Sequence, residues 1–183
     1  MNKFEVIKIQ NKGFTIVELL IALALLVIVI ALGYTFNFYV FRSFDIASKQ
    51  SEVQQSVSLA KNIIENKVRY SQMDLLDELP EEIEPGYQAI YIESGVVKYI
   101  DEDGNTSDLL GAISGNVNMQ VYFENKGDSF LRVYVQGDID GDHEYNIDSN
   151  ILIHKVTDRS DTIQGSDGTL IYFYVPPPPE EGT

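Results

Sequence analysis

An acidic stretch in the second half of the chain has the residue types of a calcium loop. Within GDIDGDHEYNID, residues 137–148, carboxylates alternate along the chain at Asp138, Asp140 and Asp142. Alternating carboxylates are the first ligands of an oxygen-rich calcium loop. The stretch departs from the EF-hand pattern, because glycine precedes the third aspartate and Ser149 takes the place of the final glutamate. The sequence therefore favours a turn at Asp140-Gly141 with solvated acids and no bound metal.

Two histidines are the only imidazoles of the chain, and neither has the surroundings of a catalytic base. His143 follows the acidic stretch. His154 lies in ILIHKV, residues 151–156, where alternation predicts a strand and no second ligand or base is spaced for it. The sequence contains no nucleophile elbow, phosphate loop or zinc signature. We therefore expect no catalytic residues, no cofactor and no enzymatic activity.

A single carboxylate stands at the edge of a long apolar run. The segment from Leu19 to Gly33 contains no polar side chain, and Glu18 directly precedes it. A charged side chain at membrane depth costs roughly 3 kcal/mol unless it finds a partner. The position of Glu18 therefore calls for a positive group close by.

The charge of the chain is divided unevenly. The formal net charge is −15; the first 13 residues hold three lysines and one glutamate, which gives +2, so the other 170 residues carry −17. Lysines next to a hydrophobic span stay on the cytoplasmic side of a membrane, which predicts an acidic domain outside. An acidic surface repels phosphate backbones and disfavours direct binding of nucleic acid. The lack of cysteine excludes thiolate chemistry and disulfide bonds.

The apolar run is too long for a cleaved secretory signal. Such signals have an apolar core of about 7–15 residues that ends in a small-residue cleavage site. A helix over 14–40 would be about 40 Å long, more than the ~30 Å core of a bilayer requires. A plain signal anchor would explain the length and the lysines, but it leaves Glu18 without a role.

The string KGFTIVELLIALALLVIVIALG, residues 12–33, closely resembles the class III signal sequence of type IV prepilins and of the pseudopilins of related secretion and uptake machines. The family consensus is Gly-Phe-Thr-Leu-Ile-Glu-Leu. Ile16 and Val17 are conservative replacements within it. The matching residues are Lys12, Gly13, Phe14, Thr15, Glu18, Leu19 and Leu20.

The resemblance implies a defined processing step and a role for Glu18. In that family a membrane peptidase cuts on the cytoplasmic side after the glycine that matches Gly13, and it methylates the new terminal amine, here that of Phe14. The family glutamate that matches Glu18 is taken to neutralise the terminal amine of a neighbouring subunit during assembly. Helical geometry agrees, because residues 14 and 18 lie one turn apart on one face and a first-turn carboxylate faces the positive end of the helix dipole.

The resemblance also implies partners and a location. The partners would be a prepilin peptidase/N-methyltransferase, other pilin or pseudopilin subunits, an inner-membrane assembly platform and the membrane itself. The protein would cross the cell membrane once, with a short cytoplasmic leader and an extracytoplasmic C-terminal domain. After assembly it would belong to a filament on the cell surface.

A second periodic segment follows the apolar run. No proline occurs between Met1 and Leu79, which predicts one long helix from about Thr15 into the seventies. A heptad coiled coil is the alternative, but the lack of a charged flanking pattern favours docking on a sheet. The apolar positions recur every three, four or seven residues, as in an amphipathic helix, at Ile46, Val53, Val57, Ala60, Ile64 and Val68.

From Tyr87 onward the period changes to two, and β-branched and aromatic residues dominate. Tight turns are indicated at Ser94-Gly95 and at residues 125–128. The pattern predicts an α+β fold, in which the long helix covers one face of an antiparallel sheet of about six strands. The strands are expected at 87–93, 96–100, 116–124, 129–135, 151–156 and 169–175.

The predicted organisation has five parts. They are a prepilin leader (1–13), a hydrophobic transmembrane and assembly helix (14–41), an amphipathic helix that continues into the head (42–79), an antiparallel β head (80–175) and a Pro-rich tail (176–183), disordered or polyproline, because proline cannot donate to a ladder.

The function predicted from these features is that of a structural subunit of a type IV pilus or a pilus-like filament of type II secretion or competence. The acidic head and the absence of a C-terminal disulfide loop favour a minor subunit that initiates or caps assembly. The alternative is a membrane-anchored extracellular adhesive or calcium-dependent binding module that uses a prepilin-like anchor.

Overall fold

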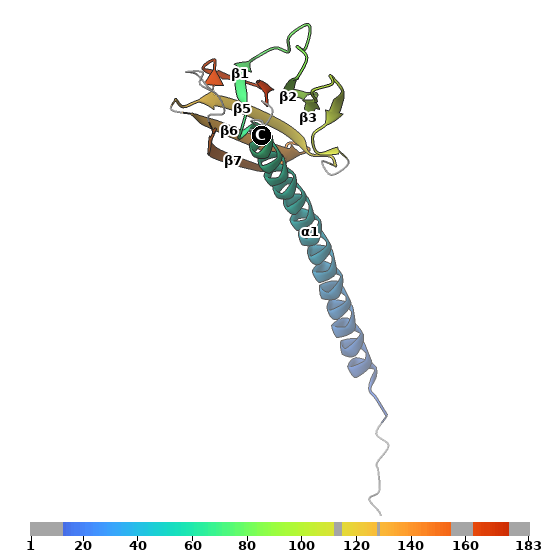
Figure 1. The fold of residues 1–183 in the computed structure, drawn as a ribbon. Coiled ribbons are helices and arrows are strands. Elements are labelled where there is room, and N and C mark those ends of the chain that lie inside the picture. Colours follow the sequence, from blue (N-terminus) through green and yellow to red (C-terminus); the bar gives the residue numbers. More distant parts are fainter. Residues whose placement is uncertain (1–12, 112–114, 128, 155–162, 176–183) are drawn as a thin grey trace, which may run out of the picture. The chain divides into compact units, whose positions relative to one another are not determined.

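The computed structural model describes residues 13–111, 115–127, 129–154 and 163–175. The chain forms two compact units, one ending at Asp45 and the other beginning at Ile46, and the helix α1 (Ile16–Val68) contributes to both (Figure 1). The predicted leader up to residue 12, the end of the strand predicted over 151–156 and the predicted tail over 176–183 lie outside the described residues.

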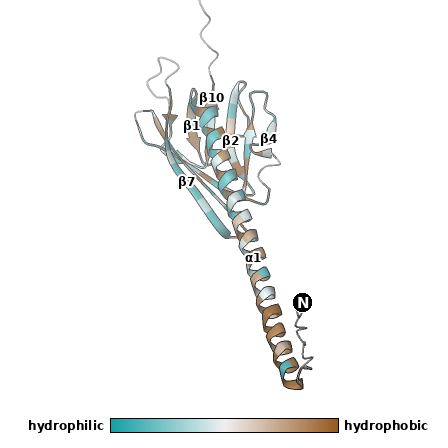
Figure 2. Cartoon of the chain, turned by 90° about the horizontal axis from the view of Figure 1, so that it is seen from below, coloured by the Kyte–Doolittle hydropathy of each residue, from teal (hydrophilic) through white to brown (hydrophobic). Residues whose placement is uncertain are grey.

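The α1 segment of the first unit is apolar on all sides from Leu19 to Gly33. Every large hydrophobic side chain from Phe14 to Phe44 is at least 44 % exposed, and none is buried within the chain. Hydrophobic colouring follows this part of the helix in Figure 2. A helix that is apolar all round needs lipid or other protein around it. By length and composition, α1 is able to cross a membrane.

The α1 segment of the second unit is amphipathic, as predicted. Its fully buried residues are Val53, Val57, Ala60, Ile64 and Val68. Ile46, the expected first member of this stripe, is 41 % exposed. Away from the core, Glu65 forms i,i+4 ion pairs with Lys61 and Arg69. The hydrogen bond from Lys61 holds the pKa of Glu65 below its usual value.

The amphipathic helix predicted over 42–79 is too long. α1 ends at Val68, and the carbonyl of Val68 accepts hydrogen bonds from the Ser71 hydroxyl at 2.8 Å and from the Ser71 N–H at 3.2 Å. Residues Gln72–Leu76 form strand β1 instead. Burial of Met73 and Leu75, and pairing of β1 with two other strands, outweigh the helical propensity of this segment.

The strands form two sheets, not the single sheet of about six strands that we predicted. The six-stranded sheet has the order β4 (Thr106–Asp108), β3 (Val96–Ile100), β2 (Tyr87–Glu93), β10 (Leu170–Tyr174), β1 and β8 (Ile163–Gln164). Its β1–β8 pair is parallel and its other pairs are antiparallel. The four-stranded sheet is antiparallel and has the order β7 (Asp142–Leu152), β6 (Phe130–Ile139), β5 (Asn118–Asn125) and β9 (Asp167–Gly168). The α+β class is confirmed.

One hydrophobic core joins the second half of α1 to both sheets. It includes Ile64 of α1, Ile90 of β2, Phe123 of β5 and Phe173 of β10, all with no exposed surface. A smaller cluster around Tyr172 packs on other residues of the six-stranded sheet. Side chains of α1 and of both sheets therefore form the core of the second unit, and the chain has no cysteine that could brace it.

The predicted hairpins are present. Ser94 and Gly95 have φ of 52° and 77° and connect β2 to β3, and Asp140 and Gly141 have φ of 57° and 74° and connect β6 to β7. Two successive residues with positive φ give the turn whose twist suits a two-residue hairpin. β5 and β6 also pair as predicted.

Candidate functional site

α1 begins with a reciprocal interaction between Thr15 and Glu18. The backbone N–H and the hydroxyl of Thr15 each donate to Oε2 of Glu18, both at 2.9 Å. The N–H of Glu18 donates in return to the Thr15 hydroxyl oxygen at 3.3 Å. This arrangement is a capping box, which satisfies two of the backbone N–H groups that a helix start leaves without partners.

The capping box gives Glu18 a role that our sequence prediction missed. Its signal was present, because Thr-x-x-Glu directly before an apolar run is the sequence pattern of this cap. An unsatisfied N–H group costs several kcal/mol in hydrocarbon. A cap therefore stabilises a helix whose first turn lies in a membrane. Both bonds use Oε2, and Oε1 has no donor among the residues that the structure describes.

Gly13 and Phe14, the predicted cleavage residues, precede the first helical residue. Both are exposed, and the Phe14 side chain is 88 % exposed. A Cβ atom added at Gly13 would meet no heavy atom within 4 Å. The bond between these residues therefore lies in open, non-helical backbone, which is the kind of segment that proteolysis favours.

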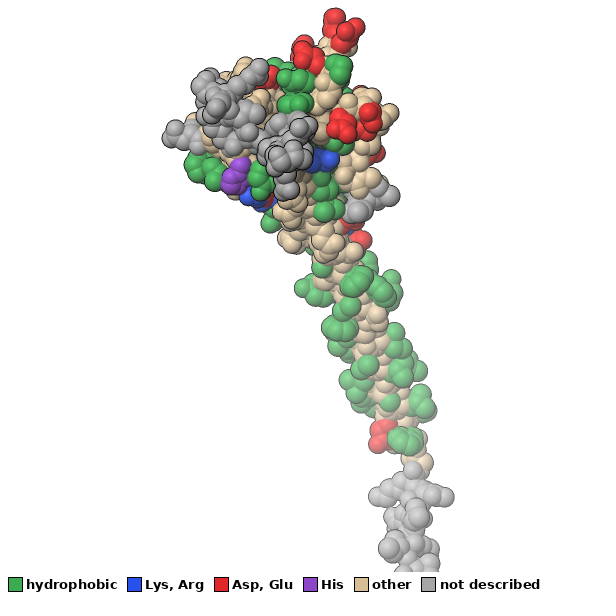
Figure 3. All heavy atoms as spheres, viewed as in Figure 1, with side chains coloured by type: hydrophobic (Ala, Val, Ile, Leu, Met, Phe, Trp, Pro, Cys, Tyr) green, Lys and Arg blue, Asp and Glu red, His purple; other side chains and the backbone are tan. Residues whose placement is uncertain are grey.

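The surface that follows the cap is continuous and hydrophobic. Hydrophobic side chains lie all along this part of α1 in Figure 3. Glu18 is the acidic residue of its first turn. Close packing with lipid tails or with other apolar helices is the interaction that such a surface permits.

The acidic stretch forms the predicted hairpin turn. Asp138 uses its two carboxylate oxygens separately: Oδ1 accepts from the Gly141 N–H at 2.9 Å and Oδ2 from the Asn118 amide at 3.1 Å. Asp140 occupies the turn itself, and Asp142 begins β7. Over the described ranges, no three metal-ligating side chains of His, Cys, Asp or Glu gather in one place.

The two histidines lie in different surroundings. His143 has a φ of 57° next to the β6–β7 turn. His154 lies beyond the end of β7, not within the strand that we predicted over 151–156, and its ring stacks on Tyr70 with centroids 5.1 Å apart. Its backbone N–H donates to the Arg69 carbonyl at 2.8 Å. This contact ties the chain after β7 to the end of α1.

The first residues of the chain match a known family model. Residues 9–34 match the model described as the prokaryotic N-terminal methylation motif. No curated protein and no solved structure matches the chain. The matched range contains Gly13, Phe14 and the Thr15–Glu18 cap. This chain therefore carries the class III prepilin signal of type IV pilin-like proteins.

Proposed function

We propose that this protein is a structural subunit of a type IV pilus or pilus-like filament and that it serves as a minor, initiating or tip subunit. The observation that carries the proposal is that one segment has two features, a methylation motif and an exposed apolar helix. The methylation motif spans residues 9–34, and the first turns of α1, which begin within it, carry apolar side chains that are exposed on all sides. The role is structural and not enzymatic.

The proposed life cycle begins in the membrane. A prepilin peptidase cuts after Gly13 and methylates the amine of Phe14, and the apolar half of α1 keeps the chain in the bilayer. Side chains that are exposed all round contact lipid before assembly and the equivalent helices of other subunits after it. An inner-membrane assembly platform carries out the transfer into the filament, which lies at the cell surface.

Glu18 sets the axial position of the incoming subunit. Its Oε2 atom is held by Thr15, which fixes the carboxylate at the helix start. Oε1 then accepts from the Phe14 amine of a neighbouring subunit. An unpaired charge in a buried position costs several kcal/mol. The axial position at which Glu18 pairs with the amine is therefore the most stable one for the incoming subunit.

The acidic head supports a minor role. The head carries nearly all of the −17 of residues 14–183, so it repels copies of itself, which opposes a subunit that must cover the whole filament. A subunit present in few copies meets other pilins and avoids this repulsion. The acidic surface also disfavours direct contact with nucleic acid.

Mass spectrometry of the N-terminal peptide tests the proposal. The mature chain should begin with a methylated Phe14, and Gly13→Leu should leave the precursor uncut. Gly33→Leu is the matched control, since an added Cβ meets no atom within 4 Å at either glycine. A mature chain that begins at Gly33 or later would indicate an ordinary signal peptidase and would remove the basis of the proposed assembly.

A further inference from the structure

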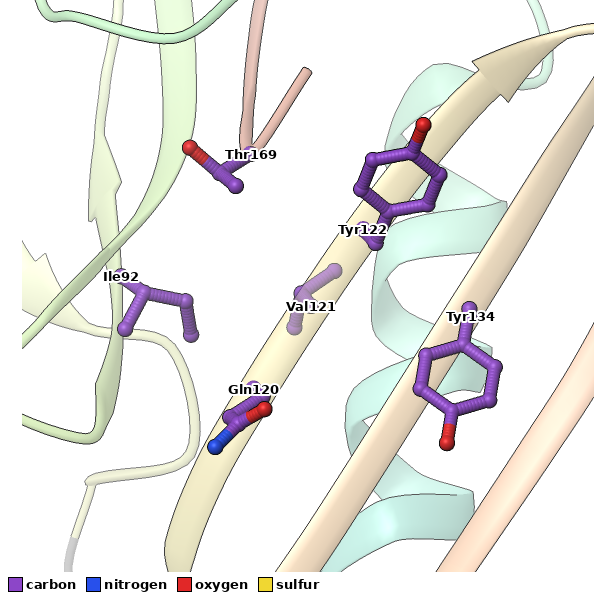
Figure 4. Close-up of a pocket in the computed structure, with 6 residues that line it drawn as sticks. All are labelled: Ile92, Gln120, Val121, Tyr122, Tyr134 and Thr169. Carbon is purple, nitrogen blue, oxygen red and sulfur yellow. The ribbon is translucent and has the colours of Figure 1, made fainter. Parts of the chain in front are cut away.

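A cavity of about 360 Å³ opens in the second unit where β5 faces β2. Figure 4 shows its lining: Ile92 of β2, Gln120, Val121 and Tyr122 of β5, Tyr134 of β6, and Thr169 between β9 and β10. Its volume lies at the small end of the range of about 300–1,000 Å³ found for ligand sites. No lining residue is charged, although the chain carries a net charge of −15.

The cavity lies on an open edge of β5. Met119 donates its N–H to the Gly95 carbonyl at 2.8 Å, and Phe123 pairs with Gly168 of β9. Backbone groups of alternate strand residues point to the same edge, so the N–H and C=O of Val121 also point there. No strand of the described chain pairs with Val121 on this edge. The cavity therefore offers the Val121 N–H as a backbone donor, between Met119 and Phe123, which both have partners on this edge.

Two tyrosine rings form one side of the cavity and are held in place. Tyr122 and Tyr134 are cross-strand neighbours on β5 and β6. The Tyr122 hydroxyl donates to Asp167 at 2.6 Å, and the Tyr134 hydroxyl donates to Gln136 at 2.8 Å. With their hydroxyls occupied, the rings present mainly apolar surface, with Ile92 across the cavity in Figure 4.

This lining suits a proline-rich segment. Proline-rich chains in the polyproline II form have no backbone N–H to satisfy, keep their carbonyls free and pack on aromatic side chains. The Gln120 amide has no hydrogen-bond partner in the part of the chain that the structure covers, and it is a donor beside the rings. Apolar rings with a few neutral donors, and no charge, favour prolines over a charged peptide.

The chain itself contains four consecutive prolines, Pro176–Pro179, directly after Val175. They begin far from the cavity of their own chain. Ile92 and Thr169 lie at one end of the β2–β10 pair, and Tyr87 pairs with Tyr174 at the other. The six residue-to-residue steps from Thr169 to Val175 span about 20 Å. Four prolines reach about 12 Å, so they do not return to this cavity.

We propose that the cavity binds Pro176–Pro179 of a second copy of the chain. The donor segment of one copy and the acceptor cavity of the next are different surfaces, so the contact is head-to-tail. It needs only two of the few copies of a minor subunit, and neither the cavity lining nor the four prolines carry charge. The inference goes beyond the proposed function and rests on it only in that assembly brings copies together.

Photo-crosslinking of the full chain in detergent tests this contact. A benzoylphenylalanine placed at Asn118, an exposed residue outside the lining and on the same face of β5 as Gln120, is activated in a mixture of ¹⁵N-labelled and unlabelled chains, and cross-linked peptides are identified by mass spectrometry. We expect cross-links between labelled and unlabelled chains that contain Pro176–Pro179. Replacing all four prolines by serine should lower their yield about tenfold. The same probe at Asn150, an exposed residue of β7, is the control and should not capture the prolines.

Two ring variants separate binding from folding. Tyr134→Phe keeps the ring and should keep the cross-link, whereas Tyr134→Ala should lose it while the near-ultraviolet circular dichroism of the other tyrosines is retained. Cross-links confined to one isotopic form, an absence of cross-links, or an unchanged yield with four serines would each overturn the proposal. The N-terminal peptide of the same samples reports processing, so a methylated Phe14 without cross-links leaves the proposed function intact.

Discussion

Glu18 accepts two hydrogen bonds from Thr15, both at one carboxylate oxygen and both 2.9 Å long. The carboxylate therefore closes the helix start within its own chain before any neighbour is present. Its second oxygen is the one that remains for a partner amine. Capping needs only an acceptor at this position, whereas pairing with an amine needs a negative charge, so substitutions distinguish the two roles.

Replacement of Glu18 should block assembly in a way that depends on charge. Glu18→Gln keeps an acceptor for Thr15 but removes the charge, and Glu18→Val removes both. We expect both variants to insert, to be cut after Gly13 and to accumulate in the membrane, with recovery in sheared filaments reduced at least about tenfold, as expected when an uncompensated buried charge is created. Quantitative immunoblots of filament and membrane fractions measure the ratio.

Thr15→Val is the control for this experiment, because it removes the hydroxyl of the cap and leaves the charge of Glu18 in place. It should assemble better than either Glu18 variant. Normal recovery of Glu18→Val in filaments would show that the carboxylate is dispensable. Normal recovery of Glu18→Gln alone would assign the residue to capping and not to charge pairing.

Local patterns predicted the helix and the hairpins. Val53, Val57 and Ile64 lie on the one face of α1 that packs on the core. Their spacing predicts a helix because it repeats with each helical turn. Ser94-Gly95 and Asp140-Gly141 are turns whose residues tolerate positive φ. In both cases the determining contacts lie within a few residues in sequence.

Distant pairings could not be read in the same way. β1 is a strand because its neighbours β8 and β10 come from residues more than eighty positions later. β8 and β9 have two residues each, too few for a period. β7 lies at the edge of its sheet, and most of its exposed positions carry polar side chains. Its sequence therefore lacks a strong alternation of apolar residues.

The candidate site was predictable because its determinants are contiguous. Gly13, Phe14 and Glu18 lie within six residues, so the motif was readable without a fold. The capping box is equally local. The sequence prediction for Glu18 includes only the pairing of its carboxylate with a terminal amine and not this cap. The cavity at Tyr122 and Tyr134 depends on four strands or connections and had no sequence signal.

Two glycines of the second unit should not tolerate alanine. A Cβ at Gly168 would lie 2.4 Å from the Leu76 carbonyl oxygen, and a Cβ at Gly137 would lie 2.7 Å from Cγ2 of Val57. The Val57 side chain is able to move away from an added Cβ more easily than the Leu76 backbone. We therefore expect Gly137→Ala to lower the free energy of unfolding by about 1–3 kcal/mol and Gly168→Ala to lower it more.

The control for this comparison is Gly104→Ala. The added Cβ meets nothing within 4 Å there, and only the positive φ of 82° opposes it, at about 1 kcal/mol. Urea unfolding of the full chain in detergent, followed by the near-ultraviolet signal of its 11 tyrosines, measures the three variants. The steric argument fails if Gly168→Ala is no less stable than Gly104→Ala.

The acidic turn should not respond to calcium. Asp138 already accepts hydrogen bonds from Gly141 and Asn118, one at each oxygen. Melts of the full chain with calcium and with chelator should coincide, since an ion that binds the folded state raises its midpoint. Asp140→Asn, which keeps a residue tolerant of φ 57°, is the control. A calcium-dependent rise that this variant abolishes would restore the calcium-binding alternative.

Two aspartates should give stability opposite dependence on pH. Burial, with a further contribution from the charge of Glu84, raises the pKa of Asp74 above its ordinary 3.8. Hydrogen bonds from Arg132, with Nε 2.8 Å from the carboxylate, lower the pKa of Asp148 below the same value. Asp74 therefore favours folding below pH 3.8 and loses this contribution as pH rises through its higher folded pKa. Asp148 favours folding above pH 3.8 and loses its contribution as pH falls through its lower folded pKa.

Asparagine at each position exposes this difference. At about pH 7, Asp74→Asn should raise the urea midpoint of the full chain because it removes an ionised group that is partly buried, and Asp148→Asn should lower it because it removes the partner of Arg132. As the pH falls below 3.8 both effects should shrink, since both carboxyls then approach the neutral form. A midpoint that Asp74→Asn lowers at neutral pH would mean that the ionised carboxylate stabilises the second unit, and the assignment of its raised pKa to burial would have to be abandoned.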